Sequence, residues 1–242
     1  MISLENVNFS FPDHENCEVL ADIKFAVKQG ETLVILGESG SGKTTILKII
    51  LGLLKPTSGK VFVDNQEITQ LKEHELMKVR RKIGMVFQEG ALFDSMTVGE
   101  NVAFSLREQS AMSEPEVETR VHQVLSFVDM EESIDKVPDE LSGGMRRRVA
   151  IARALASCDP KMMLYDEPTT GLDPITADTI CDLIVKLRDT QEVSSVIVTH
   201  LLRDAFKVGN RFIVLHEGRI LFEGTERELR SSTNPYIQKF VA

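Results

Sequence analysis

The chain has 242 residues, 42% hydrophobic and 27% charged, a composition typical of one compact globular domain. Its formal net charge of -9 provides no general attraction to nucleic acid, so we expect no nucleic-acid partner. Cys17, Cys158 and Cys181 lack the paired spacing of zinc or redox motifs, which favours a reducing, cytosolic setting. No apolar run approaches the roughly 20 residues that span a bilayer, and the first residues do not resemble a cleaved signal peptide.

The N-terminal part of the chain is predicted to contain several strands. Residues 2–11 and 23–27 are short β-rich stretches, and residues 32–36 form an apolar run bounded by Gly30 and Gly37. After Gly42 apolar residues recur at helical spacing until Pro56 and Gly59, which predicts a helix. The order strand, glycine-rich loop, helix is therefore expected here.

The glycine-rich loop fits a known phosphate-binding pattern. Residues 37–44 read Gly-Glu-Ser-Gly-Ser-Gly-Lys-Thr, which matches the Walker A pattern G-x-x-x-x-G-K-[ST] in its required strand and helix context. Its backbone N–H groups and the following helix N-terminus favour phosphate oxygens, so we predict ATP and Mg²⁺ as ligands. The residues expected to bind the nucleotide are Gly37, Glu38, Ser39, Gly40, Ser41, Gly42, Lys43, Thr44 and Thr45.

Three of these side chains have distinct expected roles. Lys43 is expected to reach the β- and γ-phosphates, Thr44 to offer its hydroxyl to Mg²⁺, and Thr45 to contact the α- or β-phosphate. A Walker A loop by itself does not separate a kinase, a GTPase, a helicase and a transporter ATPase. Further motifs decide among them.

The remainder of the chain changes from helical to strand patterns. Residues 89–158 carry charged helical patterns, such as residues 114–129, and predict an inserted helical segment. Residues 196–199 are a continuous apolar run typical of a buried parallel strand. Residues 211–215 and 219–222 flank Glu-Gly and predict a hairpin at the sheet edge.

A second acidic motif follows the helical segment. Residues 162–167 read Met-Met-Leu-Tyr-Asp-Glu, an apolar strand that ends in two acids, as a Walker B segment does. Asp166 is expected to hold Mg²⁺, and Glu167 to orient or deprotonate the attacking water. Without the Walker A loop, Glu167 would be read as a solvated residue at a strand end.

The segment between the two Walker motifs identifies a family. Residues 141–145 read Leu-Ser-Gly-Gly-Met before a helix-compatible stretch. This resembles the signature motif of the ATP-binding cassette (ABC) family, and the motif order matches that family over nearly the whole chain. The resemblance implies that Gln88 is the Q-loop glutamine, which contacts Mg²⁺ or water, that Asp173 is the D-loop aspartate, and that His200 is the switch histidine.

The family resemblance implies a fold and an assembly. Family members place the signature residues Ser142, Gly143 and Gly144 on the γ-phosphate of the opposite subunit. The implied assembly is a nucleotide-sandwich homodimer on a transmembrane permease, at the inner face of the cell membrane. The implied fold is a single α/β domain with a P-loop NTPase (RecA-like) core at 1–88 and 159–224, an N-terminal antiparallel β subdomain, an inserted α-helical subdomain at 89–158 and a C-terminal tail at 225–242.

Three assignments have an ordinary structural alternative. Phe11 lies where the family has an aromatic residue, commonly Tyr, that stacks on adenine, and the alternative is core packing. His200 follows the strand at 196–199, and the alternative is a core or capping histidine. For Gln88 the alternative is a plain surface amide. Residues 146–148, Arg-Arg-Arg, could suggest anion binding but are expected to be a solvated helix face and receive no function.

The region after Gln88 is informative about cargo, because it meets the permease in ABC proteins. Residues 88–102 resemble Mla-type and MCE-associated ATPases, which serve phospholipid and sterol trafficking, so an MCE-domain protein is an implied partner. Some Mla ATPases bind a STAS-domain protein through a C-terminal extension, and a chain that ends at Ala242 leaves that partner in doubt.

Other functions remain as alternatives. One is the ATPase of a polar-amino-acid or similar small-solute importer. A soluble ABC ATPase, such as one of iron-sulfur assembly or DNA repair, is another. It is disfavoured because repair and chromosome proteins of the family carry long insertions between the Walker segments, whereas only about 120 residues separate Lys43 from Asp166 here. A catalytically silent adaptor that binds ATP only for assembly is disfavoured because Lys43, Asp166, Glu167 and His200 are all present. The residues expected to be catalytic are Lys43, Gln88, Glu167 and His200.

Overall fold

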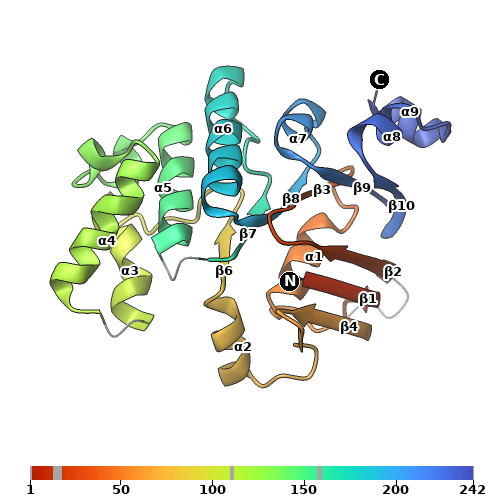
Figure 1. Cartoon of the computed structure of the whole chain (residues 1–242), viewed down its shortest axis with the longest axis horizontal. Helices are drawn as coiled ribbons and strands as arrows, with labels where there is room; N and C mark the ends of the chain where they lie inside the picture. The colour runs from red at the N-terminus through yellow and green to blue at the C-terminus, as the bar shows by residue number, and fades with distance from the viewer. Residues whose placement is uncertain (1, 13–17, 110–111, 157–159, 242) are drawn as a thin grey trace.

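A computed structural model describes residues 2–12, 18–109, 112–156 and 160–241 (Figure 1). Cys17, Cys158 and the expected border between residues 158 and 159 lie outside these described residues. Cys181 is a buried free thiol. Among the described helices, none combines the length and apolarity required to cross a bilayer.

The larger sheet has six strands in the order β10-β9-β3-β8-β7-β6. β3 lies inside its parallel part, pairing with β8 on one side and β9 on the other, while β10 pairs antiparallel with β9 at the edge. The expected run 32–36 and the expected edge hairpin are confirmed, whereas β6 was not expected. The strand bounds are β3 Thr32–Leu36, β6 Ile83–Val86, β7 Met162–Asp166, β8 Ser194–Thr199, β9 Arg211–His216 and β10 Arg219–Gly224.

The side chains of β3 alternate between two layers of core, as the period of a strand requires. Leu33 and Ile35 belong to a cluster with helix α1, Lys43–Ile50. Val34 and Leu36 belong to a second cluster with helices on the opposite face. Both faces of the sheet are therefore covered, which explains why β3 is a continuous apolar run. α1 ends at Ile50 rather than near Pro56, because Gly52 turns the chain with a φ of 63°.

A smaller antiparallel sheet packs beside α1, in the order β2-β1-β4-β5. It shares a buried cluster with α1, so the N-terminal strands cover the α1 side of the larger sheet. This agrees with the antiparallel β subdomain of the expected fold class. The strand bounds are β1 Ile2–Ser10, β2 Glu18–Val27, β4 Ser58–Val63 and β5 Gln66–Glu67.

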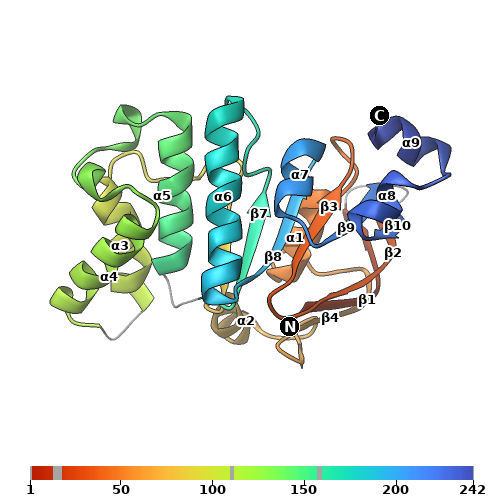
Figure 2. The ribbon, with the colours of Figure 1, turned by 45° about the horizontal axis from the view of Figure 1, so that its top comes forward.

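The helices within residues 98–156 lie together at one end of the molecule, beside α6 (Figures 1 and 2). Their apolar faces meet those of α6 in one buried cluster. The helices are α2 Glu73–Arg80, α3 Val98–Gln109, α4 Glu114–Phe127, α5 Gly143–Ala156, α6 Pro174–Gln191, α7 Leu202–Val208, α8 Glu226–Arg230 and α9 Pro235–Val241, with short 3-10 helices at Glu131–Ser133 and Pro138–Glu140.

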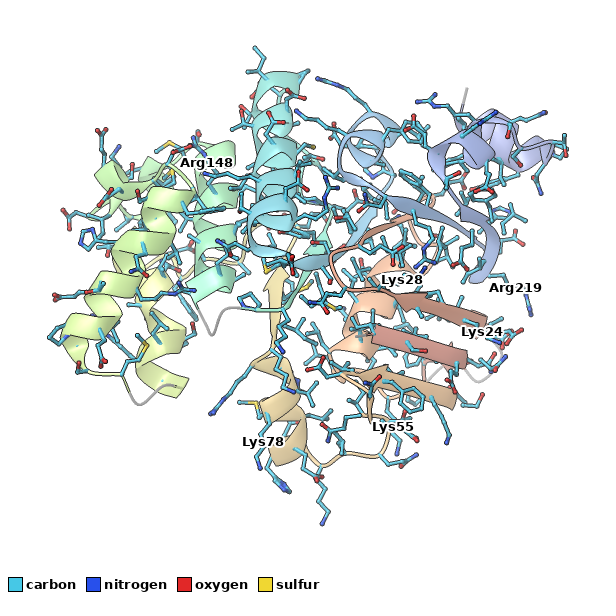
Figure 3. All side chains as sticks on the ribbon, in the orientation of Figure 1. Lys24, Lys28, Lys55, Lys78, Arg148 and Arg219 are labelled. Atoms are coloured by element: carbon cyan, nitrogen blue, oxygen red, sulfur yellow. The ribbon has the colours of Figure 1, made fainter. Side chains whose placement is uncertain are left out.

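The expectation that residues 146–148 form a solvated helix face is wrong for the middle residue. Arg147 is only 5% exposed, and its guanidinium donates to the carbonyl of Phe87 across 2.8 Å. α5 packs against neighbours on more than one side, and successive residues of a helix point about 100° apart, so Arg147 turns inward. Arg148, labelled in Figure 3, stays half-buried near Val128 and Asp129.

Candidate nucleotide-binding site

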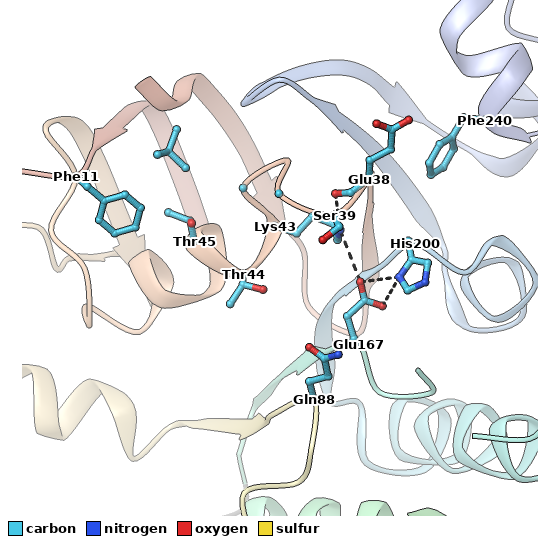
Figure 4. A pocket seen from close by; sticks show the side chains of 13 residues that line it. Phe11, Glu38, Ser39, Lys43, Thr44, Thr45, Gln88, Glu167, His200 and Phe240 are labelled. Carbon is cyan, nitrogen blue, oxygen red and sulfur yellow. Dashed lines mark hydrogen bonds and ion pairs between the residues drawn. The ribbon is translucent and has the colours of Figure 1, made fainter. Parts of the chain in front are cut away.

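A cavity of about 780 Å³ lies beside the loop between β3 and α1 (Figure 4). The Walker A loop, Gln88 and the ends of β7 and β8 all contribute to its wall. The sequence-predicted residues that line it are Phe11, Glu38, Ser39, Gly40, Gly42, Lys43, Thr44, Thr45, Gln88, Glu167 and His200. The cavity therefore brings together most of the residues that the sequence singled out.

Two glycines allow the loop to curl. Gly42 has a φ of 103° and forms the N-cap of α1, a conformation that L side chains rarely adopt. A Cβ on Gly37 would lie 2.5 Å from the carbonyl oxygen of Leu215, so a side chain is excluded there by β9. The loop is thus shaped by glycine at the points where the backbone approaches its neighbours.

Lys43 lies inside the loop with its ammonium buried. Its Nζ donates to the carbonyl oxygens of Gly37 at 2.8 Å and Glu38 at 3.0 Å, and lies 3.7 Å from Oε1 of Glu167. Burial lowers the pKa of Lys43, and the charges of Glu167 and Asp166 oppose that effect. A positive charge is therefore held at the N-terminus of α1, where phosphate groups are favoured.

Hydroxyl and carboxylate oxygens meet at the end of β7. Thr44 Oγ1 donates to Oδ1 of Asp166 across 3.0 Å. Burial raises the pKa of Asp166, and the hydrogen bond from Thr44 opposes that effect. Among the described residues there is no cluster of three or more His, Cys, Asp or Glu that could enclose a metal ion. This sparse set of oxygen donors suits Mg²⁺, which binds through one or two protein oxygens together with phosphate and water.

Glu167 is the most heavily bonded carboxylate in the cavity wall. Its Oε2 accepts hydrogen bonds from Thr170 Oγ1 at 2.9 Å and Thr199 Oγ1 at 3.1 Å, and His200 Nδ1 lies 3.0 Å from both carboxylate oxygens. Burial raises the pKa of Glu167, but the bonds from His200 and Thr170 and the charge of Lys43 outweigh it and hold that pKa below its usual value. The group is therefore ionised and oriented, as a proton acceptor must be.

Aromatic rings flank the cavity. Phe11 is 42% exposed and meets Phe9 edge-on at 5.0 Å between ring centroids, so it is not packed away in the core. Phe240, from α9, also lines the cavity, near Glu38 (Figure 4). Sequence reasoning missed Phe240, because an aromatic residue in a short amphipathic tail has no local motif.

The signature residues lie elsewhere. None of Ser142, Gly143 and Gly144, all described, lines the cavity. They stand at the start of α5, where Ser142 Oγ accepts a hydrogen bond from the backbone N–H of Met145. A Cβ on Gly144 would overlap the side chain of Thr176, so glycine is required for α5 to approach α6.

Asp173 also lies outside the cavity. Its Oδ1 accepts hydrogen bonds from the backbone N–H groups of Ile175 and Thr176, both at 3.0 Å, and caps the N-terminus of α6. These bonds lower its pKa. Thr176, whose backbone N–H donates to Asp173, is thus also the residue whose side chain packs against Gly144.

A parallel sheet with a glycine-rich loop, a buried lysine and two strand-end acids defines a P-loop nucleotide-binding protein. The family model "ABC transporter" matches residues 20–170, and this chain belongs to the ABC transporter family as an ATP-hydrolysing subunit. It is 38% identical over its whole length to the methionine import ATP-binding protein MetN of Carboxydothermus hydrogenoformans, covering 71% of that relative. It is 35% identical to the intermembrane phospholipid transport system ATP-binding protein MlaF of Haemophilus influenzae, covering 100% of this chain and 90% of the relative.

Solved structures agree with the expected fold class. A dimeric post-hydrolysis state of the ATP-binding cassette MJ0796 bound to ADP and Pi is similar with a TM-score of 0.85 and 39% identity, over 93% of this chain and 98% of that one. The structure of cbiO1 from Clostridium perfringens has a TM-score of 0.85 and 30% identity, over 100% of this chain and 98% of that one. The α/β fold with its antiparallel and helical additions is therefore confirmed as the ABC ATPase fold.

Proposed function

We propose that Glu167 is the general base for ATP hydrolysis in this chain. The observation that carries this role is its placement in the cavity wall, 3.7 Å from the Lys43 ammonium and 3.0 Å from His200. Glu167 accepts a proton from the attacking water while the water oxygen bonds to the γ-phosphorus, and the bridging oxygen leaves with ADP. His200 orients the carboxylate, and Lys43 stabilises the γ-phosphate charge.

The remaining site assignments complete this proposal. Thr44 and Asp166 would hold Mg²⁺, with the side-chain amide oxygen of Gln88 as a further donor, and Phe11 would stack on adenine. Mg²⁺ would supply charge neutralisation for the phosphate oxygens. The core at 1–88 and 159–224 carries the nucleotide, the segment 89–158 carries the signature, and residues 225–242 form the tail that contributes Phe240.

The base assignment is tested by Glu167→Gln, with steady-state hydrolysis and binding of a fluorescent ATP analogue measured on the full chain. We expect ATP binding to persist and hydrolysis to fall by roughly 10²–10⁴-fold, the usual contribution of a general base. Hydrolysis at the wild-type rate would remove Glu167 as the base.

We further propose that two copies of the chain close into a nucleotide sandwich beneath a permease. The separation of Ser142–Gly144 from their own cavity supports this, because an exposed helix N-terminus with glycines favours an anionic group from elsewhere. The dimeric state of the similar cassette MJ0796 also supports it. Placement of the chain at the inner face of the cell membrane follows from this assembly.

For the cargo we propose phospholipid, carried by a permease that works with an MCE-domain protein. The observation behind this is the resemblance of residues 88–102 to Mla-type ATPases, together with the 35% identity to MlaF. The methionine import ATP-binding proteins, which are up to 41% identical to this chain, support an amino-acid importer with equal specificity. The two cargo classes differ enough to be separated directly.

In the cargo test, the chain and its own permease are reconstituted together in proteoliposomes and supplied with ATP. Transfer of a fluorescent phospholipid to acceptor vesicles is measured in parallel with uptake of labelled methionine. ATP-dependent phospholipid transfer without methionine uptake is the expected result. The reverse pattern would assign the chain to the importer class, and the Glu167→Gln chain provides the control for ATP dependence.

A further inference from the structure

The two oxygens of the Glu167 carboxylate have different surroundings. Oε2 accepts from the hydroxyls of Thr170, at 2.9 Å, and Thr199, at 3.1 Å. Oε1 faces the Lys43 ammonium at 3.7 Å. His200 Nδ1 is 3.0 Å from each oxygen, so the ring does not distinguish them. The two threonine hydroxyls make the difference.

Thr199 is held so that its hydrogen points to Glu167. Thr199 lies at the end of β8 and is only 2% exposed. Its Oγ1 accepts a hydrogen bond from the backbone N–H of Leu201 at 3.1 Å. A hydroxyl has one hydrogen to donate. With the Leu201 N–H occupying a lone pair of Oγ1, the hydrogen is free for Oε2.

The backbone of Glu167 is fixed from the same direction. Its N–H donates to the carbonyl of Val198 at 2.9 Å, and its carbonyl accepts from the N–H of Thr170 at 3.3 Å. Its φ of 48° is a left-handed conformation that a residue other than glycine adopts at a cost and that persists only when its surroundings enforce it. β8 and the Thr170 turn therefore hold both the main chain and one carboxylate oxygen.

We propose that Thr170 and Thr199 are positioning residues for ATP hydrolysis, whose hydroxyls anchor Oε2 of Glu167 and leave Oε1 as the oxygen that accepts the proton from water. This inference rests on the proposed role of Glu167 as the base. Oε2 accepts from both hydroxyls and shares His200 Nδ1 with Oε1, so it has less remaining capacity for another hydrogen bond than Oε1 has. Oε1 lies on the Lys43 side, where the γ-phosphate would bind.

The test compares isosteric and conservative substitutions in the full chain. Thr170→Val and Thr199→Val keep the side-chain shape and remove the hydroxyl, whereas Thr170→Ser and Thr199→Ser keep it. We expect kcat of each valine variant to fall roughly ten- to a hundredfold, the effect of a lost hydrogen bond to a charged group. KM is expected to stay within about twofold, and the serine variants are expected to recover most of kcat.

Thr32→Val is the matched control. Thr32 is a fully buried strand residue whose Oγ1 has no hydrogen-bond partner among the described residues, and it stands at the start of β3, away from the cavity wall. It is expected to leave kcat unchanged. Thermal unfolding of every variant identifies any loss of fold, and the half-buried Thr170 provides a second test if Thr199→Val unfolds.

The outcomes separate this inference from the base assignment. If Glu167→Gln hydrolyses ATP at the wild-type rate, the base assignment fails. If Glu167→Gln is inactive while both folded valine variants keep wild-type kcat, only the anchoring role is overturned. A serine variant that loses as much kcat as its valine counterpart would also overturn it, because the hydroxyl would then not be the cause. In the Glu167→Gln background, Thr199→Val is expected to cause no further loss.

Discussion

Thr44 Oγ1 and Asp166 Oδ1 lie 3.0 Å apart and join the first turn of α1 to the end of β7. The two residues are 122 positions apart in the chain, and β8 lies in the sheet between β7 and β3, the strand that precedes α1. Their contact places the Asp166 carboxylate against Thr44, whose side chain lines the cavity. A divalent cation that reaches this point would replace the hydrogen bond with two oxygen ligands.

Asp166→Asn is expected to weaken Mg²⁺-dependent ATP binding roughly ten- to a hundredfold. The substitution keeps the shape and the Thr44 contact but removes the negative charge that attracts the cation. Binding of a fluorescent ATP analogue is measured with Mg²⁺ and with EDTA. Thr44→Ser, which keeps the hydroxyl, should resemble the wild type, and equal Mg²⁺ dependence in the Asn variant would count against this site.

Ser142→Arg is expected to block closure of the dimer without affecting nucleotide binding by the monomer. The side chain lies outside the cavity that holds its own Walker A loop, and a bulky cation there would obstruct an opposing subunit. Mass is measured by light scattering with ATP in the Glu167→Gln background, where closed dimers accumulate. An ATP-driven dimer of unchanged mass would show that Ser142 is not at the interface.

Arg147→Met is expected to destabilise the chain by about 1–3 kcal/mol, the cost of leaving a buried acceptor unpaired. Its guanidinium supplies the hydrogen bond to the carbonyl of Phe87, the residue before Gln88, and burial lowers its pKa. Urea unfolding measures the change. Arg148→Met, which removes only longer contacts of 3.3–3.5 Å, should cost less, and equal losses would refute a special role for Arg147.

Glu31→Gln is expected to reduce stability by about 1–2 kcal/mol at neutral pH. Glu31 is 12% exposed in its side chain and accepts two bonds from Arg211, at 2.6 and 3.0 Å. Burial raises its pKa, but these bonds and that of the Lys28 N–H outweigh it, so the folded pKa lies below the ordinary 4.5. A carboxylate whose pKa is lower in the folded state stabilises the fold at pH values above its unfolded-state pKa. That stabilisation is lost as the pH falls through its folded-state pKa.

The difference between wild type and Glu31→Gln should therefore be constant at neutral pH and shrink below about pH 4.5. Urea unfolding at a series of pH values measures it. Glu5→Gln, at an exposed position of β1, is the control for the Glu-to-Gln substitution itself. A difference between wild type and Glu31→Gln that grew on acidification would have the wrong sign for this ion pair.

Local patterns were sufficient wherever one segment carries its own signal. The run at 32–36 was predicted with both ends correct, because every residue of β3 is buried and glycines bound it. The Walker A loop was predicted in place for the same reason. By contrast, β6 was missed: Ile83–Val86 contains Gly84, which weakens the strand pattern, and only β7 beside it gives the segment a pairing partner. The inward turn of Arg147 was missed because a run of three arginines has no local sign of which one faces the core.

The sequence alone determined the chemistry of this protein, because a phosphate loop, strand-end acids and a glycine-rich signature depend on residue type and short spacing. The tertiary structure alone decided which atoms share a site. It brought Phe240 to the cavity from the end of the chain, kept Ser142 out of it, and gave Oε2 of Glu167 two hydroxyl partners from different segments. Those relationships depend on how strands far apart in sequence pair and on how helices cover them, which no local pattern encodes.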